Sequence, residues 1–420
     1  MDIPRIEINR ASLPNGLRIV HSRDYGTAMV AVNLLYDTGA RDEKRNLTGI
    51  AHLFEHLMFG GSANVPSFDA TLQAAGGKSN AWTSNDFTNF YLTLPAQNIE
   101  TAFYLESDRM LSPALSDESV EIQKGVVIEE FKQQCLDRPY GDLFHHLRRL
   151  SYAPGHPYSW PTLGLSPEHV AKVTAEDARN WFYAHYSPSN AILAVTGNVD
   201  FDKVLNLAEK WFGDIPARTI TPRHLSSPGF PTQDIREDVR AEVPLPIIVT
   251  AVPMGKYGTT SYHAADTITD ILSAGRAARF NTNLLYGPHH GMFSSAEASI
   301  IGSEHEGLLL LTARLSDNKD TTVDSAREIM LDEARKLAEA DGISPYELER
   351  TFNNFEATFH FSNIDYASKA TNLAMAEYHG EDINNSVDER RSLSADIIIS
   401  EARKLFFDTP TISLAYRPNN

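Results

Sequence analysis

Apolar side chains in the segment 46–61 recur with the spacing of one helix face. The segment reads NLTGIAHLFEHLMFGG, and its apolar positions include Ile50, Leu53, Phe54, Leu57 and Met58. Spacings of three and four residues predict an amphipathic helix whose apolar side packs into a core. Asn46 or Thr48 is expected to cap its start, and Gly60 and Gly61 are expected to end it.

Polar residues of the same segment repeat with the same spacing, displaced by two positions. His52, Glu55 and His56 therefore lie about 200° around the helix from the apolar side. Two histidines four positions apart can bind one Zn²⁺, and the glutamate beside them can take a proton from a water that the metal activates. In this H-x-x-E-H pattern Glu55 is a general base and not a ligand. The alternative interpretation is a helix with solvated polar residues.

Alternation and turn residues predict further elements along the first half. Strands are expected at 17–20 and 28–36, paired with each other, and a strand or hairpin is expected at 79–94. Helices are expected at 68–75, 98–111, 117–137, 173–186 and 203–212, with a strand at 191–195.

Residues that break helices and strands are dense between the two halves of the chain. They are Gly213, Pro216, Pro222, Pro228, Gly229 and Pro231. Such a density is typical of a linker, and 420 residues suit two domains. We predict one domain at 1–213, a linker at 214–232 and a second domain at 233–420.

Two stretches of the second half resemble stretches of the first half in sequence. The stretch 173–195 resembles 393–416, and Leu57–Gly60 resembles Leu272–Gly275. This alignment places three residues opposite the histidine motif, namely Thr267, Asp270 and Ile271. This internal resemblance indicates a duplicated fold in which only the first copy keeps the metal chemistry, and the alternative is a chance likeness.

Composition and charge narrow the classes of partner. The chain is 42% hydrophobic and 22% charged, as in soluble globular proteins, and its net charge is −18. A strongly acidic chain argues against nucleic acid and anionic membrane surfaces as partners.

Cys135 is the only cysteine, so no intrachain disulfide is expected. No apolar run is long enough to cross a membrane, residues 1–20 lack the apolar core of a secretory signal, and a cytoplasmic protein is expected.

A third metal ligand is expected on the helix at 117–137. Catalytic zinc usually takes three protein ligands and keeps one position for water. Glu129 and Glu130 adjoin on this helix, and spacing alone does not choose between them. Glutamates are also common on surface helices that bind no metal.

Three segments together resemble the pitrilysin family of inverted zincins, which includes insulin-degrading enzyme and the mitochondrial processing peptidase. They are His52–His56, the stretch GGKSNAWT at 76–83, and GVVIEE at 125–130. The resemblance implies that Glu130 is the third zinc ligand. It also implies an α+β fold of two homologous domains, each an antiparallel sheet backed by helices, enclosing a chamber. Peptide substrates would add as an extended strand at Asn80, Ala81 and Trp82.

The sequence departs from this family at two places. Gln123 stands where the family often has a second glutamate behind the zinc ligands, so one charge is absent, and either metal affinity or the basicity of the metal-bound water is expected to be lower. The family's C-terminal domain usually brings an Arg and a Tyr to the substrate, whereas the stretch 284–295 has histidines near the expected Arg and Phe293 near the expected Tyr. Phenylalanine cannot donate a hydrogen bond to a developing oxyanion. Tyr286 is out of register for that role.

The resemblance, together with these departures, implies a zinc-dependent endopeptidase that is the zinc-bearing subunit of a heterodimer, as in family members that pair two homologous subunits. A homologous partner subunit would supply the missing Arg and Tyr. A homodimer or a monomer is the alternative assembly. The alternative function is a catalytically inactive scaffold or a peptide-binding subunit.

Overall fold

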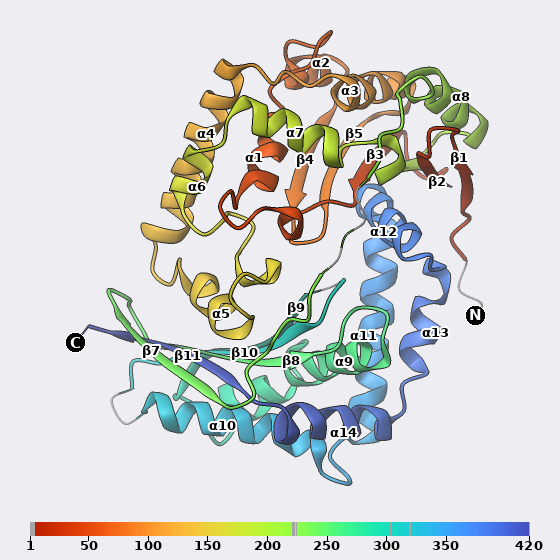
Figure 1. Cartoon of the computed structure of the whole chain (residues 1–420). Helices are drawn as coiled ribbons and strands as arrows, with labels where there is room; N and C mark the ends of the chain where they lie inside the picture. Colours follow the sequence, from red (N-terminus) through yellow and green to blue (C-terminus); the bar gives the residue numbers. More distant parts are fainter. Residues whose placement is uncertain (1–4, 221–222, 224, 303, 319–320, 420) are drawn as a thin grey trace. The chain divides into compact units, whose positions relative to one another are not determined.

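The computed structural model describes residues 5–220, 223, 225–302, 304–318 and 321–419 (Figure 1). The strands are β1 (Asn9–Ser12), β2 (Arg18–Arg23), β3 (Met29–Tyr36), β4 (Lys78–Thr83), β5 (Thr88–Pro95), β6 (Ala191–Gly197), β7 (Ile235–Ala241), β8 (Ile247–Met254), β9 (Phe293–Ile301), β10 (Gly307–Leu315) and β11 (Ile412–Pro418). The helices are α1 (Ile50–Leu57), α2 (Phe68–Ala74), α3 (Ile99–Leu111), α4 (Asp117–Phe131), α5 (Leu143–Ser151), α6 (Pro167–Ala171), α7 (Ala175–His185), α8 (Phe201–Phe212), α9 (Thr260–Ser273), α10 (Val323–Arg335), α11 (Pro345–Ile364), α12 (Tyr366–His379), α13 (Ser386–Arg391) and α14 (Ala395–Arg403). Pro222 of the predicted linker and the first four residues lie outside the described part.

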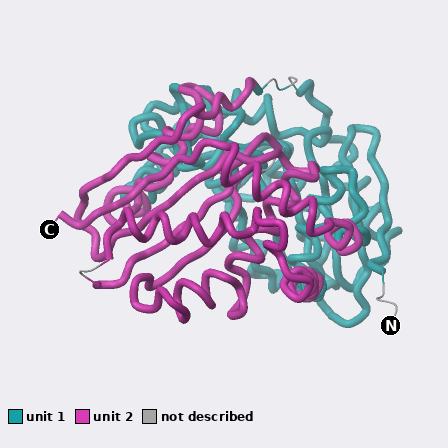
Figure 2. Tube along the Cα trace, turned by 90° about the horizontal axis from the view of Figure 1, so that it is seen from below, with its two compact units in different colours: residues 1–132, 160–225, 358–386 teal, residues 133–159, 226–357, 387–420 magenta. Residues whose placement is uncertain are grey.

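The chain folds into two compact units, and each takes segments from both halves of the sequence. Unit 1 comprises residues 1–132, 160–225 and 358–386, and unit 2 comprises 133–159, 226–357 and 387–420 (Figure 2). The domains predicted at 1–213 and 233–420 are continuous ranges, whereas these units are not. The predicted chamber concerns the arrangement of the two units and stays a prediction.

Each unit is built on one sheet, and the two sheets have the same topology. The strand orders are β1-β2-β6-β3-β5-β4 in unit 1 and β7-β11-β8-β10-β9 in unit 2. Without β1, the two orders correspond strand by strand. The pairs β2–β6 and β7–β11 are parallel, and all other neighbouring strands are antiparallel. The predicted class of two similar α+β domains is confirmed, with one parallel pair in each sheet.

The predicted pairing between the first two long strands is wrong. β2 and β3 do not pair with each other, because β6 lies between them and pairs with both. β6 comes from a position about 160 residues further along the chain, so the local pattern could not reveal its insertion.

Both faces of each sheet are covered by helices. In unit 1, α1, α3 and α8 contribute to the core on one face, and α12 packs on the other face against β3 and β6. In unit 2, α9, α10 and α14 cover one face, and α5 packs on the other against β8 and β11. The two halves of the sequence thus exchange a helix, since α5 belongs to the first half and α12 to the second. No helix in the described part of the chain has the length and apolar character needed to cross a membrane.

Candidate metal centre

The helix α1 has the two-sided character that its sequence predicts. Ile50, Leu53, Phe54 and Leu57 are buried in the core of unit 1. The side chains of His52 and His56 retain 13% and 25% exposure, so they lie at the edge of that core. The apolar stripe therefore fixes the rotation of the helix and leaves both imidazoles outside the buried core.

The start of α1 differs from the prediction, because neither Asn46 nor Thr48 caps it. The residue at the cap is Gly49, with φ +92°, a left-handed conformation that favours glycine. A Cβ at this position would meet the carbonyl oxygen of Leu163 at 2.9 Å. The Thr48 hydroxyl accepts instead from the backbone N–H of Leu165 at 2.8 Å.

Glu43 performs the capping, and sequence reasoning missed it. One carboxylate oxygen accepts from the backbone N–H groups of Gly49 and Ala51, both at 3.0 Å, and the other accepts from Nε1 of Trp160 at 2.9 Å. Burial raises the pKa of Glu43 to about 8. A glutamate six residues before the cap lies outside the usual capping patterns, so no local signal identified it.

The helix α4 brings Glu130 to the two histidines. Its start is capped by Ser116, and Val120, Val127 and Phe131 on it are buried. Oε2 of Glu130 lies 3.7 Å from Nε2 of His52 and 3.4 Å from Nε2 of His56, and the two Nε2 atoms are 3.3 Å apart. In the part of the chain that the structure describes, this is the only group of three or more His, Cys, Asp or Glu donors close enough to share a metal ion.

The neighbouring Glu129 takes no part in this cluster. Its side chain is 56% exposed and pairs with Lys132 at 3.2 Å. Successive residues of a helix point about 100° apart, so only one of two adjacent glutamates can face α1. The orientation of α4 thus distinguishes two residues that spacing left equivalent.

The three donors suit a zinc ion in their separation and in their protonation. Zn–N and Zn–O distances of about 2.0–2.2 Å in a tetrahedron set ligand atoms about 3.4 Å apart, close to the separations between the three donors. Burial, followed by the neighbouring His56, lowers the pKa of His52 to about 4, which leaves its imidazole neutral. The hydrogen bond with His56 lowers the pKa of Glu130. Neutral imidazole and ionised carboxylate are the forms that bind metal.

Glu55 lies on the same helix between the two histidines and is held by the edge strand. The Thr83 hydroxyl of β4 donates a hydrogen bond to Oε2 of Glu55. Burial raises the pKa of Glu55, although the Thr83 hydrogen bond opposes the shift. A carboxylate with a raised pKa is a stronger base, as proton abstraction from water requires. Thr83 belongs to a motif that the sequence identified, but no role had been assigned to it.

The predicted substrate residues Asn80, Ala81 and Trp82 all lie on β4. β4 is the last strand of its sheet and pairs with β5 on one side. An edge strand leaves backbone N–H and C=O groups available for another strand. Gln123 lies two turns before Glu130 on α4, with a half-buried side chain.

The two aromatic residues considered near the expected substrate-binding Tyr, Phe293 and Tyr286, both lie in unit 2. Phe293 is the first residue of β9, is 4% exposed and belongs to the core of unit 2. Tyr286 is 73% exposed and precedes this strand by seven residues. Phe293 therefore presents neither a hydroxyl nor an exposed surface.

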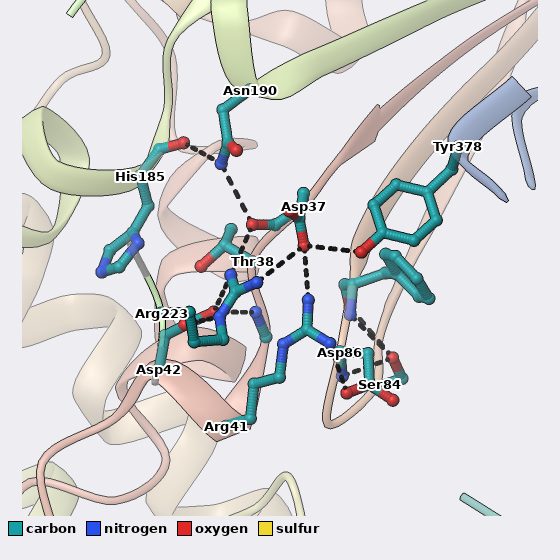
Figure 3. A network of polar contacts seen from close by, with 12 residues as sticks. Asp37, Thr38, Arg41, Asp42, Ser84, Asp86, His185, Asn190, Arg223 and Tyr378 are labelled. Atoms are coloured by element: carbon teal, nitrogen blue, oxygen red, sulfur yellow. Dashed lines mark hydrogen bonds and ion pairs between the residues drawn. The ribbon is translucent and has the colours of Figure 1, made fainter. Parts of the chain in front are cut away.

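A network of ion pairs fixes the turn that connects β4 to β5 (Figure 3). Arg41 is 2% exposed at its side chain and donates to Asp86 at 2.8 Å and to Asp37. Arg223, from the predicted linker, pairs with Asp37 at 3.2 Å, and Tyr378 of α12 donates to the same carboxylate at 3.4 Å. The network joins four segments of unit 1 that are distant in the sequence. The turn that it holds begins directly after Thr83, the residue that bonds to Glu55.

Two family models match consecutive parts of the chain. The family model "Insulinase (Peptidase family M16)" matches residues 18–147, and the model "Peptidase M16 inactive domain" matches residues 172–355. The first match contains His52, Glu55, His56 and Glu130. The second lies mostly in the half that lacks the motif.

Several relatives are zinc proteases by name. The chain is 25% identical to zinc protease PqqE of Helicobacter pylori over 419 residues, which cover 97% of this chain and 92% of the relative. It is 29% identical to the mitochondrial-processing peptidase subunit beta of Saccharomyces cerevisiae over 224 residues, 53% of this chain and 47% of that subunit. Matches to zinc proteases of Streptomyces coelicolor and Mycobacterium leprae likewise span about half of those proteins.

A solved structure shares the complete fold. The crystal structure of a protease from Helicobacter pylori superposes with a TM-score of 0.89 at 23% identity, covering 99% of this chain and 100% of that one. Two models of one family and a relative matched over almost its full length thus agree with the motifs in the sequence. The chain belongs to peptidase family M16, the pitrilysin family that these motifs indicate.

Proposed function

We propose that this chain is a zinc-dependent endopeptidase that cleaves extended peptides. His52, His56 and Glu130 hold the ion, and Glu55 is the general base. One observation carries this proposal. Donor atoms of two histidines and one glutamate lie at separations that suit zinc, and the carboxylate of Glu55, which is not a ligand, lies on the same helix as the histidines. The zinc-protease names of the relatives support the same activity.

The residues divide the chemistry between them. A bound zinc ion supplies Lewis acidity, which lowers the pKa of a water and polarises the scissile carbonyl. Glu55 accepts the proton of the attacking water and delivers it to the leaving amine. The Thr83 hydroxyl fixes the orientation of Glu55, and the free edge of β4 aligns the peptide by backbone pairing.

The proposal includes a heterodimer in which a homologous subunit supplies an Arg and a Tyr to the substrate. The burial of Phe293 and the lack of a hydroxyl there support this part. The yeast relative is itself named as a subunit. A homodimer or a monomer is the competing assembly, and an inactive scaffold or peptide-binding subunit is the competing function. The cytoplasmic location stays a prediction, and one similar solved structure is described as a periplasmic protease.

A chelator-controlled cleavage assay with Glu55→Gln tests the activity. The zinc-loaded chain should cleave a quenched fluorescent peptide, and Glu55→Gln should lower kcat by about 10²–10⁴-fold while zinc content is unchanged. Glu118→Gln, an exposed change in the first turn of α4, is the matched control and should leave the rate unaltered. Cleavage that appears only after a homologous subunit is added would support the heterodimer. A zinc-loaded chain inactive in every combination would contradict the peptidase and favour the scaffold.

A further inference from the structure

A hollow in unit 1 lies beside the edge strand, on the face of the sheet away from the metal ligands. Thr83 of β4 bonds to Glu55 of α1, and Ala81 packs against the core that contains α1. Side chains alternate along a strand, so Asn80 and Trp82 belong to the opposite face. Trp82 indeed packs with the cluster that contains α12.

The walls of this hollow come from the sheet and from the start of α12. It has a volume of about 320 Å³ and is lined by Trp82, Tyr91, Asp365, Ser368, Thr371 and Asn372, among others. Asn80 pairs with Tyr91 in the register of β4 and β5, so Tyr91 shares the face of Trp82. We call this space the Trp82 hollow. Such a volume can take one long side chain.

The charge of the Trp82 hollow favours a cationic guest. Asp365 is the only charged residue among those that line it. One oxygen of Asp365 accepts from the backbone N–H of Ser368 at 2.7 Å and caps α12, and the other oxygen has no hydrogen bond within the described chain. Lys369, one turn along, is directed to Asp24 at 3.6 Å. Indole and phenol rings attract a cation at their faces.

A buried amide on the same face has unused hydrogen-bonding capacity. Asn89 is opposite Trp82 in the strand register and is 0% exposed. Neither its nitrogen nor its oxygen has a hydrogen-bond partner in the described part of the chain. Buried polar groups are almost always satisfied, so this face is incomplete without water or a guest.

We propose that the Trp82 hollow is a specificity pocket for a lysine or arginine side chain of the bound peptide. A strand that pairs with the free edge of β4 continues its alternation, so every second side chain of that strand falls on the face of Trp82 and Asn80. A long cationic side chain there enters between the two aromatic rings and pairs with the free oxygen of Asp365. This assignment rests on the proposed peptidase function.

The variant Asp365→Asn tests the pocket without removing the helix cap, because asparagine caps helices as well as aspartate does. A series of quenched peptides carries Lys, Arg or Met at one position at a time, and kcat/KM is measured for each. Binding of the same peptides, labelled, to the Glu55→Gln chain is measured by fluorescence anisotropy. The unmodified chain should prefer Lys or Arg over Met at one position by about tenfold, and Asp365→Asn should lower the preference to the part that the two aromatic rings supply.

Asp69→Asn is the matched control, since Asp69 is an exposed aspartate in the first turn of α2 in the same unit. It should leave the preference unchanged. Peptides that are bound and cleaved with no cationic preference, or with one that Asp365→Asn leaves intact, would overturn the pocket and leave the peptidase standing. If the chain neither binds nor cleaves any of the peptides, both the peptidase function and the pocket are overturned.

Discussion

The helices α1 and α9 hold equivalent places in the two sheets but present different chemistry. Along the chain, each helix follows a central strand and precedes the edge strand of its sheet. α1 comes between β3 and β4, and α9 comes between β8 and β9. The sequence alignment sets His52, Glu55 and His56 of α1 opposite Thr267, Asp270 and Ile271 of α9. Ile271 and Thr267 are both 0% exposed. The shared topology confirms the duplication that the internal resemblance in sequence indicated.

In unit 2 a guanidinium group occupies the polar side of the helix. Arg390 of α13 donates to the Thr267 hydroxyl at 2.6 Å, pairs with Asp266 and lies 4.0 Å from Asp270. In unit 1 the donors of His52, His56 and Glu130 face one another, and no arginine or lysine of the described chain pairs with them. The comparison shows what separates the candidate metal centre from a structural ion pair. Both place polar atoms together on a helix, but only the candidate metal centre has no arginine or lysine paired with it in the described chain.

The largest effect is expected from removing one of the three candidate metal ligands in unit 1. Glu130→Ala should lower zinc affinity by about a thousandfold or more, because an apparent binding free energy of about 10–16 kcal/mol is shared by only a few ligands. Peptide cleavage should disappear with the metal. Zinc content after dialysis against a graded chelator measures the change. Glu129→Ala alters the adjacent, exposed residue and should have no effect, and equal zinc loss in both variants would refute the ligand assignment.

An intermediate effect is expected from removing the guanidinium of unit 2. Arg390→Met should destabilise the surroundings of α9 by about 3 kcal/mol, because it leaves Asp266 and Asp270 partly buried without their cation. Hydrogen exchange of the α9 amides measures this loss.

The neighbouring residue provides the control for that experiment. Arg391 makes a more exposed pair with Glu356, so Arg391→Met should change α9 exchange by less than about 1 kcal/mol. Zinc content should be the same in both variants. Reduced zinc in Arg390→Met would mean that the two helices are not independent.

The smallest expected effect concerns the pH dependence of unit 2. Burial, together with the nearby Asp266, raises the pKa of Asp270 from 3.8 to about 6, although Arg390 opposes the shift. The unfolded chain releases this proton first, so the contribution of Asp270 to stability should fall as pH rises from about 4 to about 6. Asp270→Asn should remove that slope and stabilise unit 2 at pH 7 by about 1 kcal/mol, after allowance for partial exposure. Urea unfolding at several pH values tests this, and an unchanged slope in the variant would contradict it.

The sequence predicted those parts of the centre that depend on one helix at a time. The apolar stripe of α1 predicted the rotation of the helix. That rotation, with the spacing of His52, Glu55 and His56, predicted that the three side chains lie together on its other side. The choice between Glu129 and Glu130 required the packing of α4 against α1, which depends on contacts between separate elements. The capping by Glu43 and the insertion of β6 between β2 and β3 are likewise tertiary contacts, and local patterns do not encode them.

The exchange of α5 and α12 has a consequence for the order in which the chain can fold. By the time residue 225 has been synthesised, all three candidate metal ligands and every strand of the first sheet exist, but the face of that sheet that α12 covers is still bare. Val20, Ala31 and Ile192 would remain in contact with water until residues 366–379 arrive. A nascent chain released early would therefore carry a complete ligand set on a sheet with one exposed apolar face, a form prone to aggregation. Synthesis of the second half thus limits when the first half can complete its fold.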